Sequence, residues 1–200
     1  MDIIPLINLK KRNMVQNRED SQQSFNELLE QIDKEDEIYI LDTDGIEKDK
    51  PNLCLYQKIS EQRKIWADGG PRVLGDVVDA VMAGATKITL RKNLWPNLDI
   101  SSIKEITECE VYFNIDLNTL NKFNMGTYLP YNIDGLVIFH NKNQIESDFK
   151  SVSYLKNLCT KYKIFAYESE LENLYYWKTL GITGLLVDID RVREFKKDGF

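Results

Sequence analysis

The fold is decided by the segment EIYILDTDGI (residues 37–46) and its continuation KIWADGGPR (residues 64–72). The apolar run from Ile38 to Leu41 predicts a buried strand that stops at an acidic, glycine-containing segment. Pro51 suits the first turn of a following helix, and a second short strand follows from Lys64 to Ala67. Two strands joined by a helix form a βαβ unit, in which functional side chains gather at the carboxyl ends of the strands.

The same alternation repeats along the whole chain, at a spacing of roughly 25 residues. Its strands are continuous apolar runs, as expected of parallel strands covered by helices. Eight strands are predicted, at Asp2–Asn8, Ile38–Leu41, Lys64–Ala67, Thr86–Leu90, Glu110–Ile115, Asp134–Phe139, Lys163–Tyr167 and Thr183–Val187. Helical segments are predicted at about Ser21–Ile32, Pro51–Glu61, Val73–Ala83, Ile100–Ile106, Asn118–Asn124, Ser147–Lys161, Leu171–Leu180 and Val192–Lys197.

Eight such units predict a compact (β/α)₈ TIM barrel, with residues 1–200 forming a single α/β domain. The Lys10-Lys11-Arg12 run is expected to be a loop or a solvated face. The alternative fold is an open, doubly wound sheet. That fold would need a glycine-rich nucleotide-binding turn after the first strand, and Asn8-Leu9-Lys10-Lys11 is not one.

Composition limits the classes of partner. A net charge of -6 with 29% charged residues does not favour binding to nucleic acid or to anionic membranes. Three cysteines without close spacing exclude a full disulfide framework and do not form a zinc motif. No apolar run reaches the length of a membrane span, and the first residues do not read as a signal peptide. We expect a cytoplasmic protein that acts on a small molecule, without a cofactor.

Polar side chains follow most of the predicted strands, and a closed barrel would bring them to one rim. Asp68 and Asp116 are the candidate general acid or base, because crowded carboxylates can be shifted towards neutral pKa values. His140, the only histidine, is a candidate proton shuttle. A divalent cation bound by several of the acids is an alternative, but no spacing motif supports it.

Each of these residue types also has a purely structural interpretation. Acids that follow strands often cap helices or lie in solvated loops. A single histidine is usually structural, and Gly69-Gly70 is as compatible with a tight turn as with a phosphate cradle.

The segments Leu41-Asp42-Thr43-Asp44-Gly45 and Asp68-Gly69-Gly70-Pro71-Arg72, with the Asp2–Leu9 strand, resemble the HisA/HisF family. These proteins are the sugar-phosphate isomerase and the cyclase of histidine biosynthesis, and the order of the eight units resembles theirs over nearly the whole chain. The resemblance implies a barrel of two similar halves, with one acid after strand one, another after strand five, and glycine-rich phosphate nests.

The resemblance places the two acids of the family at Asn8 and Asp116 and a phosphate nest at Gly69-Gly70. With the residues identified above, the candidate catalytic residues are Asn8, Asp68, Asp116 and His140, and the candidate substrate- or phosphate-binding residues are Asp42, Gly69, Gly70, Arg72 and Arg91. Two departures stand out. Asn8 replaces the first acid, and an amide cannot take up a proton as a carboxylate does. The nests expected after the last two strands are replaced by Glu168-Ser169-Glu170 and Asp188-Ile189-Asp190, whose carboxylates would repel a phosphate.

Two functions follow from these expectations. The first is a diverged isomerase-like enzyme that acts on a small, phosphorylated metabolite by carboxylate proton transfer, with Asn8 orienting the substrate. The second is a catalytically altered or inactive relative that serves as a metabolite-binding or protein-interaction module.

Overall fold

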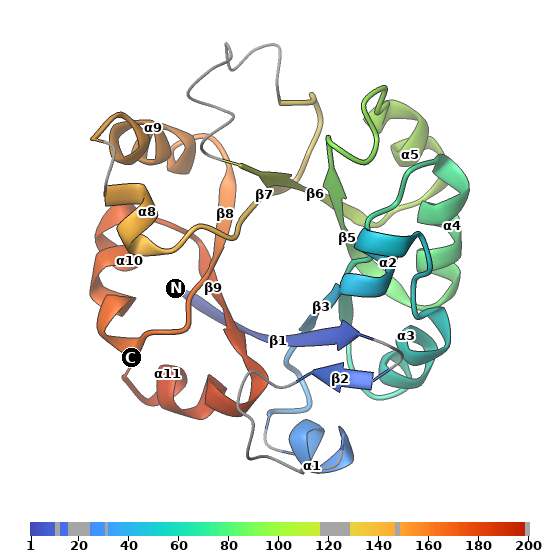
Figure 1. Cartoon of the computed structure of the whole chain (residues 1–200), viewed down its shortest axis with the longest axis horizontal. Coiled ribbons are helices and arrows are strands. Elements are labelled where there is room, and N and C mark those ends of the chain that lie inside the picture. Colours follow the sequence, from blue (N-terminus) through green and yellow to red (C-terminus); the bar gives the residue numbers. More distant parts are fainter. Residues whose placement is uncertain (11–12, 16–24, 31, 117–128, 147–148, 199–200) are drawn as a thin grey trace.

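The computed structural model describes residues 1–10, 13–15, 25–30, 32–116, 129–146 and 149–198. Eight strands run parallel and in sequence order around a closed barrel, and helices surround it (Figure 1). These strands are β1 (Asp2–Lys10), β3 (Ile38–Asp42), β4 (Ile65–Asp68), β5 (Ala85–Arg91), β6 (Glu110–Ile115), β7 (Gly135–Ile138), β8 (Lys163–Tyr167) and β9 (Gly184–Asp188).

The first and last strands close the barrel. β1 pairs with β9 in parallel, from Asp2 opposite Gly184 to Leu6 opposite Asp188. Gly184 allows this closure, since a Cβ atom there would lie 2.8 Å from the carbonyl oxygen of Asp2. The predicted (β/α)₈ barrel is therefore confirmed, and the open doubly wound alternative is excluded.

The helices of the described residues lie outside the barrel. They are α1 (Phe25–Glu30), α2 (Thr43–Lys48), α3 (Leu53–Ser60), α4 (Leu74–Met82), α5 (Ile100–Ile106), α8 (Lys142–Glu146), α9 (Phe149–Cys159), α10 (Leu174–Leu180) and α11 (Val192–Asp198), with 3₁₀ turns at Leu171–Asn173 and Ile189–Arg191. Their apolar faces cover outward-facing strand residues such as Ile40, Leu90 and Val187 in one large core.

Three local predictions need correction or lie outside the described residues. The Lys10 end of the basic run belongs to β1, and a short antiparallel strand, β2 (Asn13–Val15), follows it. Helix α2 starts directly after β3, where only the end of a strand was predicted. The helical turn predicted at residues 118–124 lies outside the described residues, as do the candidate caps Ser147 and Asp148.

Aromatic side chains fill the inside of the barrel. We call this set the lumen cluster: Leu6, Tyr39, Trp66, Tyr112, Val137, Phe165 and Leu186. The Trp66 ring centroid lies 4.1 Å from that of Tyr112 and 5.0 Å from those of Tyr39 and Phe165. The interior is therefore packed, and a ligand of the barrel must bind above this layer, at the carboxyl ends of the strands.

Candidate functional site

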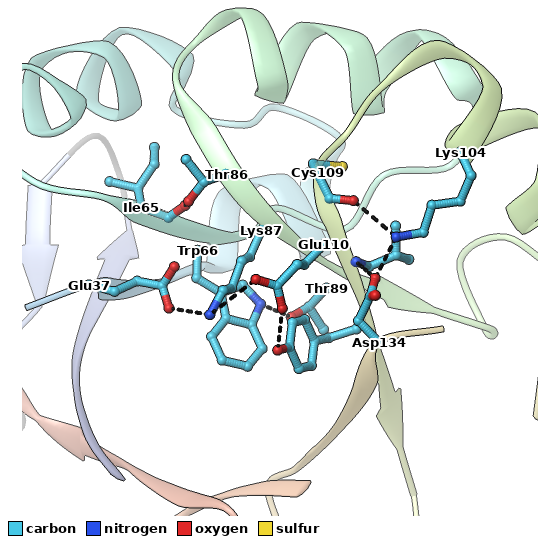
Figure 2. A network of polar contacts seen from close by, with 12 residues as sticks. Glu37, Ile65, Trp66, Thr86, Lys87, Thr89, Lys104, Cys109, Glu110 and Asp134 are labelled. Atoms are coloured by element: carbon cyan, nitrogen blue, oxygen red, sulfur yellow. Dashed lines mark hydrogen bonds and ion pairs between the residues drawn. The ribbon is translucent and has the colours of Figure 1, made fainter. Parts of the chain in front are cut away.

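At the amino ends of the strands, beyond the lumen cluster, a layer of polar side chains closes the barrel. Figure 2 shows part of this layer. The amino group of Lys87 lies 2.9 Å from a Glu37 carboxylate oxygen and 3.8 Å from one of Glu110. The same amino group lies over the rings of Trp66 and Tyr112, 5.4 and 5.8 Å from their centroids. All of these groups have partners, so we interpret this layer as structural.

Strand register sorts the polar residues at the carboxyl ends into two sets. Leu9, which belongs to the outer core, pairs with Asp42, so Asp42 faces the helices and not the lumen. Glu168 lies two residues after the outward-facing Ala166 and shares its side of the strand. The inward positions carry Asn8, Asp68, Arg91, Asn114 and Asp188, which follow the lumen cluster along their strands.

Asp42 is fully buried and holds the connection after β3 together. Its carboxylate accepts hydrogen bonds from the backbone N–H groups of Gly45 (3.2 Å) and Asn52 (2.6 Å). The Asn52 amide at 2.7 Å and the Tyr56 hydroxyl at 3.0 Å complete the set. Burial beside this carboxylate raises the pKa of Tyr56 well above its usual value. Asp42 therefore acts as a helix cap and loop anchor, in line with the structural interpretation of strand-end acids.

Glu168 fills its own backbone nest after β8. One carboxylate oxygen accepts from the backbone N–H groups of Ser169 and Glu170, both at 2.8 Å. The other accepts from the Trp177 indole at 2.8 Å and from the Asn173 amide at 3.1 Å. The N–H groups that would form a phosphate nest at this position are thus bound to a carboxylate of the same chain.

Asp68 is fully buried in the lumen and forms a two-point ion pair with Arg91. The Arg91 Nε and Nη2 atoms lie 2.9 and 2.6 Å from the two carboxylate oxygens. The Tyr39 hydroxyl also donates to Asp68, at 2.7 Å. Burial disfavours the charged form of Arg91, but the charge and hydrogen bonds of Asp68 outweigh it and raise the Arg91 pKa. Both carboxylate oxygens of Asp68 are thus occupied by Arg91 and Tyr39, which disfavours its predicted role as general base.

Asp116 and His140 are brought together at the rim. The His140 Nε2 atom lies 3.2 Å from Asp116 Oδ1, although the two residues follow different strands, β6 and β7. The Asp116 side chain is 52% exposed and that of His140 is 15% exposed. Asp116 continues the inward-facing row of β6 after Tyr112 and Asn114. This pair is the one sequence-predicted acid/base couple that the structure joins directly.

Two further polar contacts lie on the same rim. The Thr43 hydroxyl donates to Asn8 Oδ1 at 2.8 Å, which fixes the Asn8 side chain. The Tyr167 hydroxyl donates to Asp188 Oδ2 at 3.0 Å.

Gly69, Gly70 and Arg72 form a tight junction between the β4–α4 connection and α2. A Cβ atom on Gly45 would lie 2.3 Å from the Gly69 carbonyl oxygen, and Gly70 has a positive φ of 65°. The Arg72 guanidinium donates to the carbonyl oxygens of Gly45, Ile46 and Gly70 and to the Asp49 carboxylate, over 2.8 to 3.1 Å. The backbone N–H groups of Arg72 and Val73 donate to Asp76. Arg72 therefore acts as a clamp, and phosphate binding beside Gly69-Gly70 stays a prediction.

Sequence reasoning missed three polar members of the rim and lumen. Tyr39, Asn114 and Tyr167 lie within strands, where their apolar neighbours conceal them. Alternate residues of a strand share a face. The inward orientation of these three residues could therefore have been found by counting two residues back from Leu41, Asp116 and Ser169.

The sequence has no significant match among protein-family models or among curated proteins. In the described ranges, no group of three or more His, Cys, Asp or Glu side chains is arranged to hold a metal ion. None of the helices in those ranges has the length and apolarity that crossing a membrane requires.

Proposed function

We propose that this chain is a barrel enzyme that transfers a proton on a small polar metabolite, with Asp116 as the acid/base group and His140 as its partner. The observation that carries the proposal is the Asp116–His140 contact at 3.2 Å on the carboxyl-end rim. Asp116 is half exposed, whereas Asp42, Asp68 and Glu168 are buried and hydrogen-bonded. Among the strand-end acids discussed above, Asp116 is thus the best placed to meet a substrate.

The reaction class follows from the groups available. A carboxylate held by an imidazole can remove a proton from carbon next to a carbonyl and return it to the neighbouring carbon. This is the chemistry of an aldose–ketose isomerase, which the resemblance to the HisA/HisF family also implies. The substrate in this proposal is a small sugar-like compound, and a phosphate on it would bind beside Gly69-Gly70.

A second function is favoured by Asn8. Its side-chain oxygen accepts from Thr43, and its amide cannot replace the acid that the family resemblance implies there. A barrel with half of its acid pair fits a metabolite-binding or protein-interaction module that has lost catalysis.

Deuterium exchange separates the two functions. The purified protein is incubated in D₂O with ribose, ribulose and their 5-phosphates, and loss of the exchangeable C–H signal is followed by NMR. The enzyme proposal predicts exchange above the buffer rate for at least one sugar. It also predicts a loss of at least about 100-fold in Asp116→Asn, since positioned acid/base groups typically contribute that much or more.

Glu61→Gln is the matched control, because it makes the same acid-to-amide type of change on an exposed residue at the amino-end face. Its exchange rate should equal that of the wild type. If no sugar exchanges, the enzyme proposal is rejected, and a rise in melting temperature with any of the four sugars would then support the binding module.

A further inference from the structure

A directed chain of buried hydrogen bonds runs up the barrel to Arg91. The Trp66 indole N–H donates to Thr89 Oγ1 at 2.9 Å, and the Thr89 and Tyr39 hydroxyls are 3.2 Å apart. The single Tyr39 proton is directed at Asp68, 2.7 Å away, so the Thr89 hydroxyl supplies the proton between those two. Burial and the Asp68 charge raise the pKa of Tyr39 well above its usual value, so it stays a donor.

Arg91 is held by only one edge of its guanidinium group. Nε and Nη2 are bound to Asp68, whereas Nη1 makes a long contact of 3.4 Å with the side-chain oxygen of Asn114. The side chain is 16% exposed and lies over the Phe139 ring, 5.8 Å from its centroid. Among the described residues, Nη1 has no carboxylate partner, and its two N–H groups point away from the Asp68 pair.

Strand register places Arg91 and Asp116 on neighbouring strands at the same rim. Arg91 and Asn114 are register partners on β5 and β6. Asp116 lies two residues further along the same inward-facing row, about 7 Å from Asn114 at the usual strand rise. A small compound bound at this part of the rim can therefore contact both side chains.

We propose that Arg91 binds and polarises the carbonyl oxygen of the substrate, and that Asp68 and Tyr39 position its guanidinium group. This inference rests on the proton-transfer function proposed above and narrows the substrate to a compound with a carbonyl beside a CH–OH group. Asp116 takes the proton of that C–H bond, its electron pair forms a C=C bond, and the carbonyl π pair moves to oxygen. The resulting enediolate oxygen is held by the Arg91 Nη1–H groups. The Asp116 proton then returns to the former carbonyl carbon, the hydroxyl proton of the neighbouring carbon passes to the enediolate oxygen, and the electron pair left on the hydroxyl oxygen forms the new carbonyl, which restores the Asp116 carboxylate.

The arrangement suits a developing negative charge better than a charged ground state. Asp68 already neutralises Arg91, so the pair attracts a permanent dianion weakly. A fixed N–H donor in a water-poor site still stabilises charge that forms on an oxygen during the reaction, and such donors typically contribute about 100- to 1,000-fold in rate.

The test compares two small probes. Glycolohydroxamate mimics the planar, negatively charged enediolate, and glycolamide is its neutral counterpart. The wild type should bind the hydroxamate at least about tenfold more tightly by calorimetry, because transition-state mimics gain from donors directed at developing charge. Arg91→Lys should lose this preference, because an ammonium group cannot bind Asp68 with two nitrogens and also reach the substrate. Tyr39→Phe should lose part of it.

Removing only the Arg91 guanidinium would leave the buried Asp68 carboxylate without its ion-pair partner, which destabilises the fold. The double variant Asp68→Asn/Arg91→Gln removes both charges together, and its folding is checked by circular dichroism. It should also lose the hydroxamate preference. Arg193→Lys, on the exposed face of α11, is the control for the Arg-to-Lys change and should keep it.

The outcomes separate this inference from the proposed function. If Arg91→Lys or the folded double variant keeps the wild-type preference, the role of Arg91 is overturned, even when deuterium exchange depends on Asp116. If the preference requires Arg91 but no sugar exchanges deuterium, Arg91 binds the oxyanion in a non-catalytic module and the enzyme proposal alone fails. Equal binding of both probes by the wild type overturns the inference.

Discussion

Individual carboxylates at the ends of different strands have opposite roles in this barrel. Glu168 accepts four hydrogen bonds and is 2% exposed, whereas the Asp116 side chain is 52% exposed and contacts His140. The difference arises from strand parity. Glu168 belongs to the outward row, where the helices surround it, and Asp116 belongs to the inward row at the open rim.

This contrast predicts opposite effects of the same acid-to-amide substitution. Glu168→Gln replaces one acceptor oxygen by a donor and should lower the free energy of unfolding by about 1–3 kcal/mol, because buried N–H groups lose their partner. Asp116→Asn should change it by less than about 0.5 kcal/mol, as is usual for exposed sites. Urea denaturation measures both. Equal losses in the two variants would contradict the assignment of Glu168 to the fold and Asp116 to the site.

At the scale of elements, the connections after β3 and β4 form one locked unit. Asp42 caps α2 and anchors Asn52, while Arg72 binds three carbonyl oxygens of α2 and the neighbouring turn. The sequence predicted β3 and β4, which lead into this unit, and it identified Asp42, Gly69, Gly70 and Arg72 as candidate binding residues. It did not predict α2, because Asp-Thr-Asp-Gly has low helix propensity and the helix depends on the Asp42 cap and on tertiary packing.

Two glycines provide a matched test of this junction. Gly45→Ala places a Cβ atom 2.3 Å from the Gly69 carbonyl oxygen, so it should destabilise the protein by about 1–3 kcal/mol through overpacking. Gly75→Ala, on α4, meets nothing within 4 Å and should stabilise by up to about 1 kcal/mol, because alanine favours the helix. Thermal unfolding of the two variants measures the difference. A neutral Gly45→Ala would show that the α2 junction is loose.

For the whole molecule, hydrophobic periodicity was sufficient to predict the barrel. The eight strand predictions each overlap a barrel strand, because continuous apolar runs between helices leave few other parallel arrangements. The candidate site was harder to predict. Sequence spacing placed Asp42, Asp68, Asp116 and Glu168 at strand ends alike. Register and the neighbouring helices distinguish Asp42 and Glu168 from Asp116, and the contacts with Arg91 and Tyr39 distinguish Asp68.

Buried tyrosines make the stability of the whole fold sensitive to alkaline pH. Burial raises the pKa of Tyr39, Tyr56, Tyr112, Tyr154 and Tyr176, the last to about 12. Their stabilisation is complete below the unfolded pKa of about 10 and is lost as the pH rises, because the unfolded chain ionises first. Urea midpoints should therefore fall progressively as the pH rises from about 10 to about 12. Phenolate absorbance from all tyrosines near pH 10 in the still-folded protein would contradict this.

The central claim is that Asp42, Asp68 and Glu168 build the fold, whereas Asp116 faces the substrate. Carbodiimide coupling of glycinamide to the native protein, followed by peptide mass spectrometry, tests it without knowledge of the substrate. The account predicts rapid labelling of Asp116 and protection of Asp42, Asp68 and Glu168 until the protein is unfolded. Labelling of any of these three at the rate of Asp116, in the folded protein, would contradict it.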